Sequence, residues 1–167
     1  MDQELHLSSK KRRDRIFRYA PLLIWIGVIF YLSSGQGSIS ETSRIIRPIL
    51  EFLFPNAPEA TLLTYHGYIR KFAHLAEYAV LGLLAALAFV TSSKIKIRNY
   101  WLLPALGLVL MTASLDEINQ SFNTARTGSG WDVLLDMTGG ITAILIVWVF
   151  ARGRPESANN KAHLESN

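Results

Sequence analysis

The sequence predicts an all-α integral membrane protein, a four-helix bundle with both termini in the cytoplasm. Half of the 167 residues are hydrophobic. Four long apolar runs follow one another, and each extends to about the 20 residues that a helix needs to cross a hydrocarbon core of about 30 Å. Lys and Arg residues are distributed unevenly among the segments between these runs, and this asymmetry orients membrane helices.

The four apolar runs are interpreted as membrane spans because they are apolar around their whole circumference. A helix in a soluble four-helix core, the competing interpretation, would keep a polar stripe toward water. The predicted spans are residues about 15–34, 71–91, 100–120 and 131–150. The first run could also be a cleaved signal peptide. It lacks an A-x-A-like cleavage site and is rich in aromatic residues, which favours an uncleaved span.

The distribution of basic residues predicts which side each loop faces. Twelve of the 17 Lys and Arg residues lie near the N-terminus, in the link between the second and third runs, or after the fourth run. Basic residues near span ends stay cytoplasmic. Residues 1–14 are therefore a basic cytoplasmic segment, residues 15–150 form the membrane domain, and the polar tail 151–167 is cytoplasmic and expected to be disordered.

The segment between the first two spans is expected to contain a short amphipathic helix on the outer face. Ser38 and Glu41 form a capping-box pattern. Apolar residues then follow at helical spacing: Ile45, Ile46, Ile49, Leu50 and Leu53. Such a helix can lie in the membrane interface, and a plain tether is the alternative. The sequence FPNAP ends it, and a new helix can begin near Pro58 and continue into the second span.

Polar residues of the spans gather at one level, near the predicted outer ends. They are Lys71, His74 and Glu77 in the second span, Asp116, Glu117 and Gln120 in the third, and Asp132 and Asp136 in the fourth. Acids within a membrane usually face the interior of the bundle, pair with another group and carry function. The sequence therefore predicts one polar site that faces outward.

Four residues of this layer are the predicted catalytic residues. His74 and Glu77 share a helix face and could together bind a metal ion or a proton. Asp116 lies near a helix C-terminus, where the helix dipole disfavours negative charge, so it needs a cation or a proton. It shares a face with Gln120, four residues later. Asp136 lies too deep to cap its helix, and we expect it to face Glu77 or to share a ligand with it.

The predicted set for binding a substrate or an anion is Lys71, Gln120, Arg126 and Asp132. Arg126 could hold an anion such as phosphate together with backbone N–H groups at the start of the fourth span, or it could neutralise nearby acids. Asp132 follows Ser129 by three residues, so it could complete a capping box, belong to the site, or do both.

Other features limit the chemistry. The chain has no cysteine, which excludes disulfides, thiolate ligands and cysteine nucleophiles. Gly139, Gly140 and Ala143 are predicted to let the fourth span approach a neighbouring helix closely, which is a structural role. The basic residues follow the membrane topology, so nucleic-acid binding has no support.

Four sequence blocks, in this order, resemble the VanZ-like family. They are FYLSSGQ, YIRKFAHLAEYAVLGLL, LDEINQSF and ARTGSGWDVLLDMTGG, and the resemblance covers about residues 20–150. The family pattern falls on Lys71, His74, Glu77, Tyr78, Asp116, Glu117, Gln120, Arg126, Asp132, Asp136 and Gly139. Asn119 departs from it, because the family often has His at that position.

The resemblance implies a small multi-pass protein of the bacterial cytoplasmic (inner) membrane that serves the cell envelope. Founding members are linked to low-level resistance to the glycopeptide teicoplanin. The resemblance implies no established reaction, and the substrate, the oligomeric state and whether the chain is an enzyme are left open.

The residues themselves support two main hypotheses for function. The first is an enzyme that acts on a phosphorylated envelope lipid or peptidoglycan precursor, with the four predicted catalytic residues as general acid and base or as ligands of a divalent cation. The second is a non-catalytic binding or accessory protein of the membrane. A small proton-coupled transporter is a third alternative. Five carboxylates face three fixed cations in the polar layer, which favours a bound cation or shared protons.

Overall fold

The computed structural model describes the backbone of residues 2–34, 39–122 and 129–152, and the side chains of residues 13–34, 44–122 and 129–152. Within these ranges all regular secondary structure is helical, which confirms the predicted fold class. The helices are α1 (Asp2–Ser33), α2 (Ile39–Leu53), α3 (Glu59–Val90), α4 (Ile95–Asn99), α5 (Leu102–Ser121) and α6 (Gly130–Arg152). The predicted disordered tail, from residue 153 onward, lies outside the described residues.

Four helical segments are long and apolar enough to cross a membrane, namely Arg13–Ser33 of α1 and all of α3, α5 and α6. They match the four predicted spans, so the chain is a multi-pass membrane protein. α3 begins directly after Pro58, as predicted, and runs unbroken for 32 residues. At about 1.5 Å per residue it is about 48 Å long. It is therefore longer than the hydrocarbon core, and part of it extends beyond that core.

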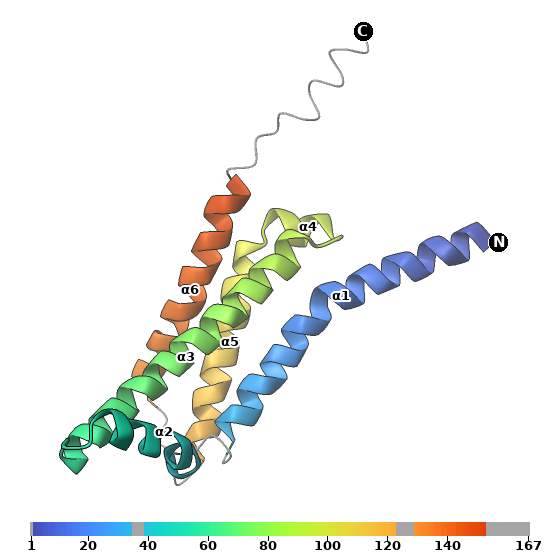
Figure 1. The fold of residues 1–167 in the computed structure, drawn as a ribbon. Coiled ribbons are helices and arrows are strands. Elements are labelled where there is room, and N and C mark those ends of the chain that lie inside the picture. The colour runs from blue at the N-terminus through green and yellow to red at the C-terminus, as the bar shows by residue number, and fades with distance from the viewer. Residues whose placement is uncertain (1, 35–38, 123–128, 153–167) are drawn as a thin grey trace.

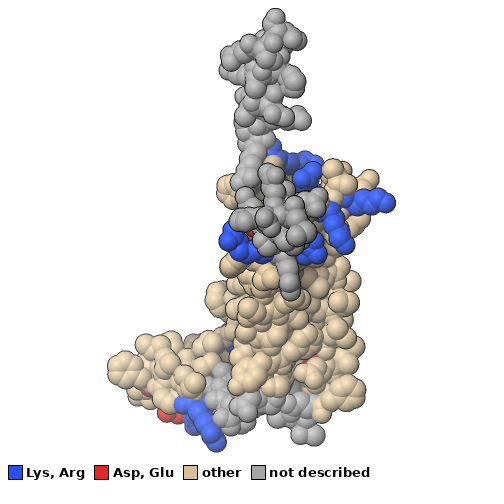
Figure 2. Space-filling model, turned by 90° about the vertical axis from the view of Figure 1, so that its right-hand side faces the viewer, with Lys and Arg blue, Asp and Glu red and all other residues tan. Residues whose placement is uncertain are grey.

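The described chain forms a bundle with two distinct ends (Figure 1). α2, the C-terminal ends of α1 and α5 and the start of α6 lie at one end, which we call the α2 end. α4, the start of α1 and the C-terminal end of α6 lie at the other, which we call the α4 end. On the face shown in Figure 2, Lys and Arg side chains gather at the α4 end, next to a band made almost entirely of uncharged side chains. This pattern agrees with the positive-inside rule.

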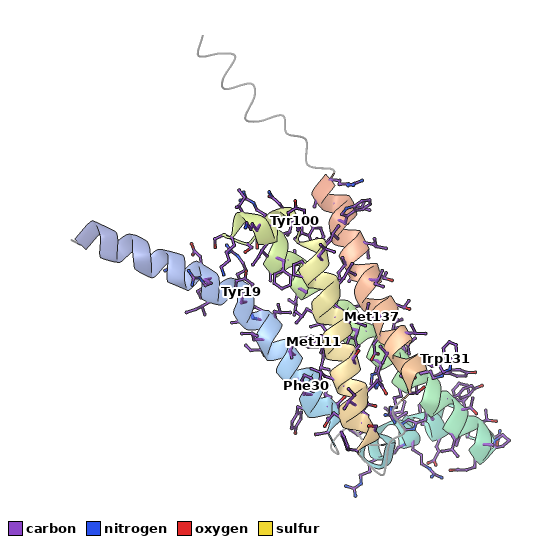
Figure 3. The ribbon with its side chains drawn as sticks, turned by 180° about the vertical axis from the view of Figure 1, so that it is seen from behind. Tyr19, Phe30, Tyr100, Met111, Trp131 and Met137 are labelled. Atoms are coloured by element: carbon purple, nitrogen blue, oxygen red, sulfur yellow. The ribbon has the colours of Figure 1, made fainter. Side chains whose placement is uncertain are left out.

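Exposed aromatic residues mark both ends of the bundle (Figure 3). Trp131, at the start of α6, is 80% exposed, and Tyr100, before α5, is 67% exposed. Trp and Tyr prefer the two membrane–water interfaces, where the ring meets lipid and the polar atom meets water. Their positions fit a bilayer that surrounds the middle of the bundle.

α3 is the central helix, and its closest partner is α6. An added Cβ on Gly139 would collide with the backbone carbonyl oxygen of Leu75, and one on Gly82 would collide with the backbone of Gly140. The predicted close approach of the fourth span is therefore confirmed. Because lipid tails are as apolar as leucine, such close backbone packing is a main source of helix association in membranes.

α1 packs against α3 and α5 and also makes directional polar contacts with the bundle. Near the middle of the spanning part of α1, Trp25 Nε1 donates to the backbone oxygen of Glu77 at 3.0 Å. Nearer the α4 end, the Tyr19 hydroxyl lies 3.1 Å from Ser92 Oγ. These bonds fix both the rotation and the depth of α1 relative to α3.

α2 packs on the first part of α3 through Leu50, which is 5% exposed. Arg47 joins the two helices, since its guanidinium donates to Glu51 at 2.7 Å and to Glu59 at 2.8 Å. Several large apolar side chains of α2 remain exposed: Ile45, Ile49, Phe52 and Leu53. An interfacial position for α2 stays a prediction. The predicted capping box depends on Ser38, which lies outside the described residues.

The orientation of the bundle can be tested with single cysteines, because the chain has none of its own. We expect Asn56→Cys, at the α2 end, to react with a membrane-impermeant maleimide on intact cells. Asn99→Cys, at the other end, should react only after lysis. Both positions are exposed, so a difference in labelling reports the side of the membrane. The reverse pattern would contradict the outward placement of the α2 end.

The close contact between α3 and α6 predicts the effect of one methyl group. Gly139→Ala should destabilise the protein by about 1–3 kcal/mol, because the methyl group meets a backbone atom that cannot rotate away. The matched control is Gly107→Ala, where an added Cβ meets nothing within 4 Å. Thermal unfolding of the two variants in the same detergent measures the difference. Equal midpoints would contradict the close contact.

Candidate functional site

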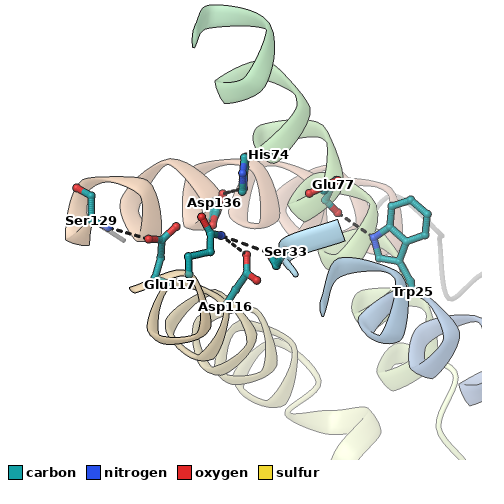
Figure 4. A network of polar contacts seen from close by, with 9 residues as sticks. Trp25, Ser33, His74, Glu77, Asp116, Glu117, Ser129 and Asp136 are labelled. Atoms are coloured by element: carbon teal, nitrogen blue, oxygen red, sulfur yellow. Dashed lines mark hydrogen bonds and ion pairs between the residues drawn. The ribbon is translucent and has the colours of Figure 1, made fainter. Parts of the chain in front are cut away.

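Three ionisable side chains from three helices converge toward the α2 end of the bundle (Figure 4). His74 comes from α3, Asp116 from α5 and Asp136 from α6, and one ligand atom of each lies within 4.8 Å of the other two. His74 Nδ1 is 3.5 Å from Asp136 Oδ1. We call these three residues the His–Asp cluster. Three of the four predicted catalytic residues therefore meet.

The cluster is almost completely shielded from solvent. Asp136 is 0% exposed and Asp116 is 1% exposed, while the side chain of His74 is 14% exposed. Within the described part of the chain, both carboxylate oxygens of Asp136, Oδ1 of Asp116 and Nδ1 of His74 lack a hydrogen-bond partner. A buried carboxylate without donors is costly. The cluster therefore requires a proton, water or a cation to complete it.

Gln120 supports one side of the cluster. Its Nε2 donates to Asp116 Oδ2 at 3.0 Å and to Ser33 Oγ at 3.3 Å. The predicted pairing of Asp116 with Gln120 along one helix face is confirmed. Because Ser33 ends α1, the same amide links α1 to α5 at the level of the cluster. The role of Gln120 toward an anion stays a prediction.

Ser129 is the N-cap of α6, and its capping contacts differ from the predicted capping box. Its Oγ accepts from Trp131 N at 3.2 Å, which is an N-cap bond. Its own N–H, which the capping box assigned to Asp132, donates instead to Glu117 Oε2 at 2.8 Å. The capping interpretation of Asp132 is therefore wrong. Glu117 is only 6% exposed, so it is not a solvated acid at the rim of the bundle.

The other predicted site residues lie outside the cluster. Glu77 is half-buried and is not one of the three grouped ligands, so Asp136 meets His74 and Asp116 where we expected it to face Glu77. Lys71 is exposed and Asp132 is half-buried. Arg126 lies outside the described residues.

Sequence reasoning did not single out Tyr78 as a site residue, although it lies one helical turn after His74. It is 0% exposed, and its hydroxyl has no hydrogen-bond partner among the residues that the structure describes. The spacing of four residues, which places both side chains on one face of α3, was the available signal.

An imidazole beside two carboxylates can carry out two kinds of chemistry. The three groups can share and transfer protons as a general acid and base. They can also bind a metal ion, since imidazole and carboxylate are both common ligands. Both uses need the groups to be held in place, and here three helices and the Gln120 amide hold them.

Comparison with known proteins identifies a family for the chain. The model of the VanZ/LLP1 family matches residues 19–151, a range that includes the whole His–Asp cluster and most of each of the four membrane spans. No curated protein and no solved structure matches the chain. Because the family match covers most of the sequence, the chain belongs to the VanZ/LLP1 family.

Proposed function

We propose that this protein serves the bacterial cell envelope from the cytoplasmic membrane, acting through its polar site on a phosphorylated lipid or peptidoglycan precursor at the outer face. The convergence of His74, Asp116 and Asp136 carries the proposal. A bundle that only crossed the membrane would have no use for three buried ionisable groups at one level, since each is costly to insert.

In the proposed reaction the His–Asp cluster supplies general acid and base catalysis. Imidazole changes its charge near neutral pH, which suits it to accept and return a proton. Asp136, whose Oδ1 is 3.5 Å from His74 Nδ1, would orient the ring and stabilise its protonated form. Asp116, which Gln120 holds in place, would bind a polar group of the substrate beside the one that exchanges a proton with His74.

Lys71 and Arg126 are the proposed ligands of the phosphate, with Asp132 and Gln120 beside them. Arg126 precedes Ser129, the N-cap of α6, by three residues in the sequence. Arg126 is therefore close in the sequence to the start of α6, and the positive end of a helix dipole attracts anions. This end of α6 is also the end from which Asp136 enters the cluster.

A non-catalytic role is the second candidate. The sequence has no cysteine and no recognised nucleophile motif, and this favours a protein that binds a precursor, a glycopeptide or a partner without transforming it. In that case the cluster would be a recognition site, and the link to teicoplanin resistance would arise from binding alone.

The charge of Asp136 should be required for function. We expect Asp136→Asn to remain folded and membrane-inserted, because the amide keeps the shape of the side chain and relieves repulsion with Asp116. Protection of a susceptible host against teicoplanin should fall to the level of an empty vector. Asp14→Asn, the same change at an exposed position outside the site, should protect as the wild type does.

Two results would contradict this part of the proposal. Full protection by Asp136→Asn would leave Asp136 as a polar packing residue. A wild-type protein that gives no protection at all would remove the glycopeptide link.

The guanidinium of Arg126 should matter beyond its charge. We expect Arg126→Lys to reduce protection clearly, because a guanidinium grips phosphate with two parallel bonds, whereas an ammonium is a point charge. Arg44→Lys, in α2, is the matched control and should be silent. Unchanged protection in Arg126→Lys would show that Arg126 only balances nearby acids.

A further inference from the structure

We infer that the His–Asp cluster binds one divalent cation of the first transition row, such as Zn²⁺ or Mn²⁺, with His74, Asp116 and Asp136 as its protein ligands. The inference rests on the proposed function and deepens it, because the cation would supply the contact for the substrate phosphate inside the site. It also replaces the sequence-based candidate set, which included Glu77.

The spacing of the three ligand atoms suits one ion. Ligands at about 2.0–2.2 Å from an ion can be up to about 4.4 Å apart when they lie on opposite sides of it. The three atoms of the cluster lie within 4.8 Å of one another. The three atoms are therefore close to coordination distance, and the side chains must close in further to hold one ion.

The hydrogen bonds of the two carboxylates leave the ligand positions open. Gln120 donates to Oδ2 of Asp116, and Oδ1 receives no donor from the described residues. Asp136, which is fully buried, has no donor on either oxygen within the same residues. Asp116 therefore has the arrangement found around metal-ligating carboxylates, with a supporting hydrogen bond on one oxygen and the other oxygen left open.

Charge balance favours a dication over the alternatives. Two buried carboxylates with a neutral imidazole carry a charge of about −2, and separating such charges from water is expensive. Within the part of the chain that the structure describes, no Lys or Arg pairs with Asp116 or Asp136. A proton on His74 would cancel one negative charge, and neutrality would then need a second proton on a carboxyl group, whereas one divalent cation cancels both charges.

The ligand types indicate which cation. An imidazole ligand favours the first transition row, while Mg²⁺ and Ca²⁺ prefer sites made of oxygen alone. Three protein ligands leave at least one coordination position for water or a substrate oxygen. An open position of this kind is what a bound phosphate needs.

The test measures binding of Zn²⁺ and of Mn²⁺ to the purified full-length protein in detergent, by titration calorimetry and metal analysis. We expect one ion per chain. Asp136→Asn and His74→Ala should each weaken binding at least about tenfold. Glu117→Gln is the matched control and should bind as the wild type does. It also loses a buried carboxylate, next to Asp116, and its amide oxygen can still accept from Ser129.

Three results would overturn the inference: no stoichiometric ion on the wild type, equal loss in Glu117→Gln and Asp136→Asn, or a metal-edge X-ray absorption spectrum of the loaded wild type that shows oxygen ligands alone. The spectrum needs no variant, so it decides even where a substitution prevents folding.

The metal test and the protection test can fail separately. No ion on the wild type, with protection still lost in Asp136→Asn, would overturn the metal site and keep the proposed function, with a shared proton in place of the ion. One ion on the wild type with full protection by Asp136→Asn would support the metal site and contradict the proposed function.

Discussion

The backbone contact between α3 and α6 is the constraint on which the site depends. Gly139 lies against the carbonyl of Leu75. Leu75 directly follows His74, and Gly139 is less than one turn beyond Asp136. The absence of a side chain at Gly139 therefore sets the distance between the two helices at the level where the imidazole and the carboxylate meet. A wider separation would leave Asp136 buried without His74.

The helices of the bundle associate in two ways, by close packing and by hydrogen bonds. α3, α5 and α6 pack through small and apolar side chains, with Ala85 and Ala105 fully buried among them. Water does not drive helices together within a bilayer, so close packing and hydrogen bonds must do so. The polar groups of the cluster are then confined to a region of low dielectric, where each electrostatic interaction is stronger than in water. The packing that forms the fold thus also strengthens the electrostatic interactions within the cluster.

Much of the fold could be predicted from the sequence, because span length, apolar composition and the break at Pro58 are local properties. The pairing of Asp116 with Gln120 could also be predicted, since both residues lie on one helix. The pairing of His74 with Asp136 could not. It depends on how each helix is rotated about its axis, and a span that is apolar all round carries little information about rotation. Similar depth suggested Glu77 as the partner of Asp136, but depth does not decide which way a side chain points.

The N-cap of α6 shows a second limit of local reasoning. Asp132 has the correct spacing for a capping box, yet the Ser129 N–H bonds Glu117, which is 12 residues away in the chain. A tertiary partner replaced the local one because the end of α5 lies beside the start of α6. No short pattern in the sequence encodes that proximity.

The polar contacts of α1 have a consequence for traffic between the lipid and the interior of the bundle. Trp25 bonds the backbone of Glu77, and Ser33 bonds Gln120, so the helix is fastened at its middle and at the level of the cluster. Acyl chains neither donate nor accept hydrogen bonds, so a lipid that entered between α1 and the rest of the bundle would leave these groups unsatisfied. Entry of lipid between α1 and the rest of the bundle is therefore unfavourable. A lipid headgroup that reached the interior would therefore have to enter elsewhere than along α1.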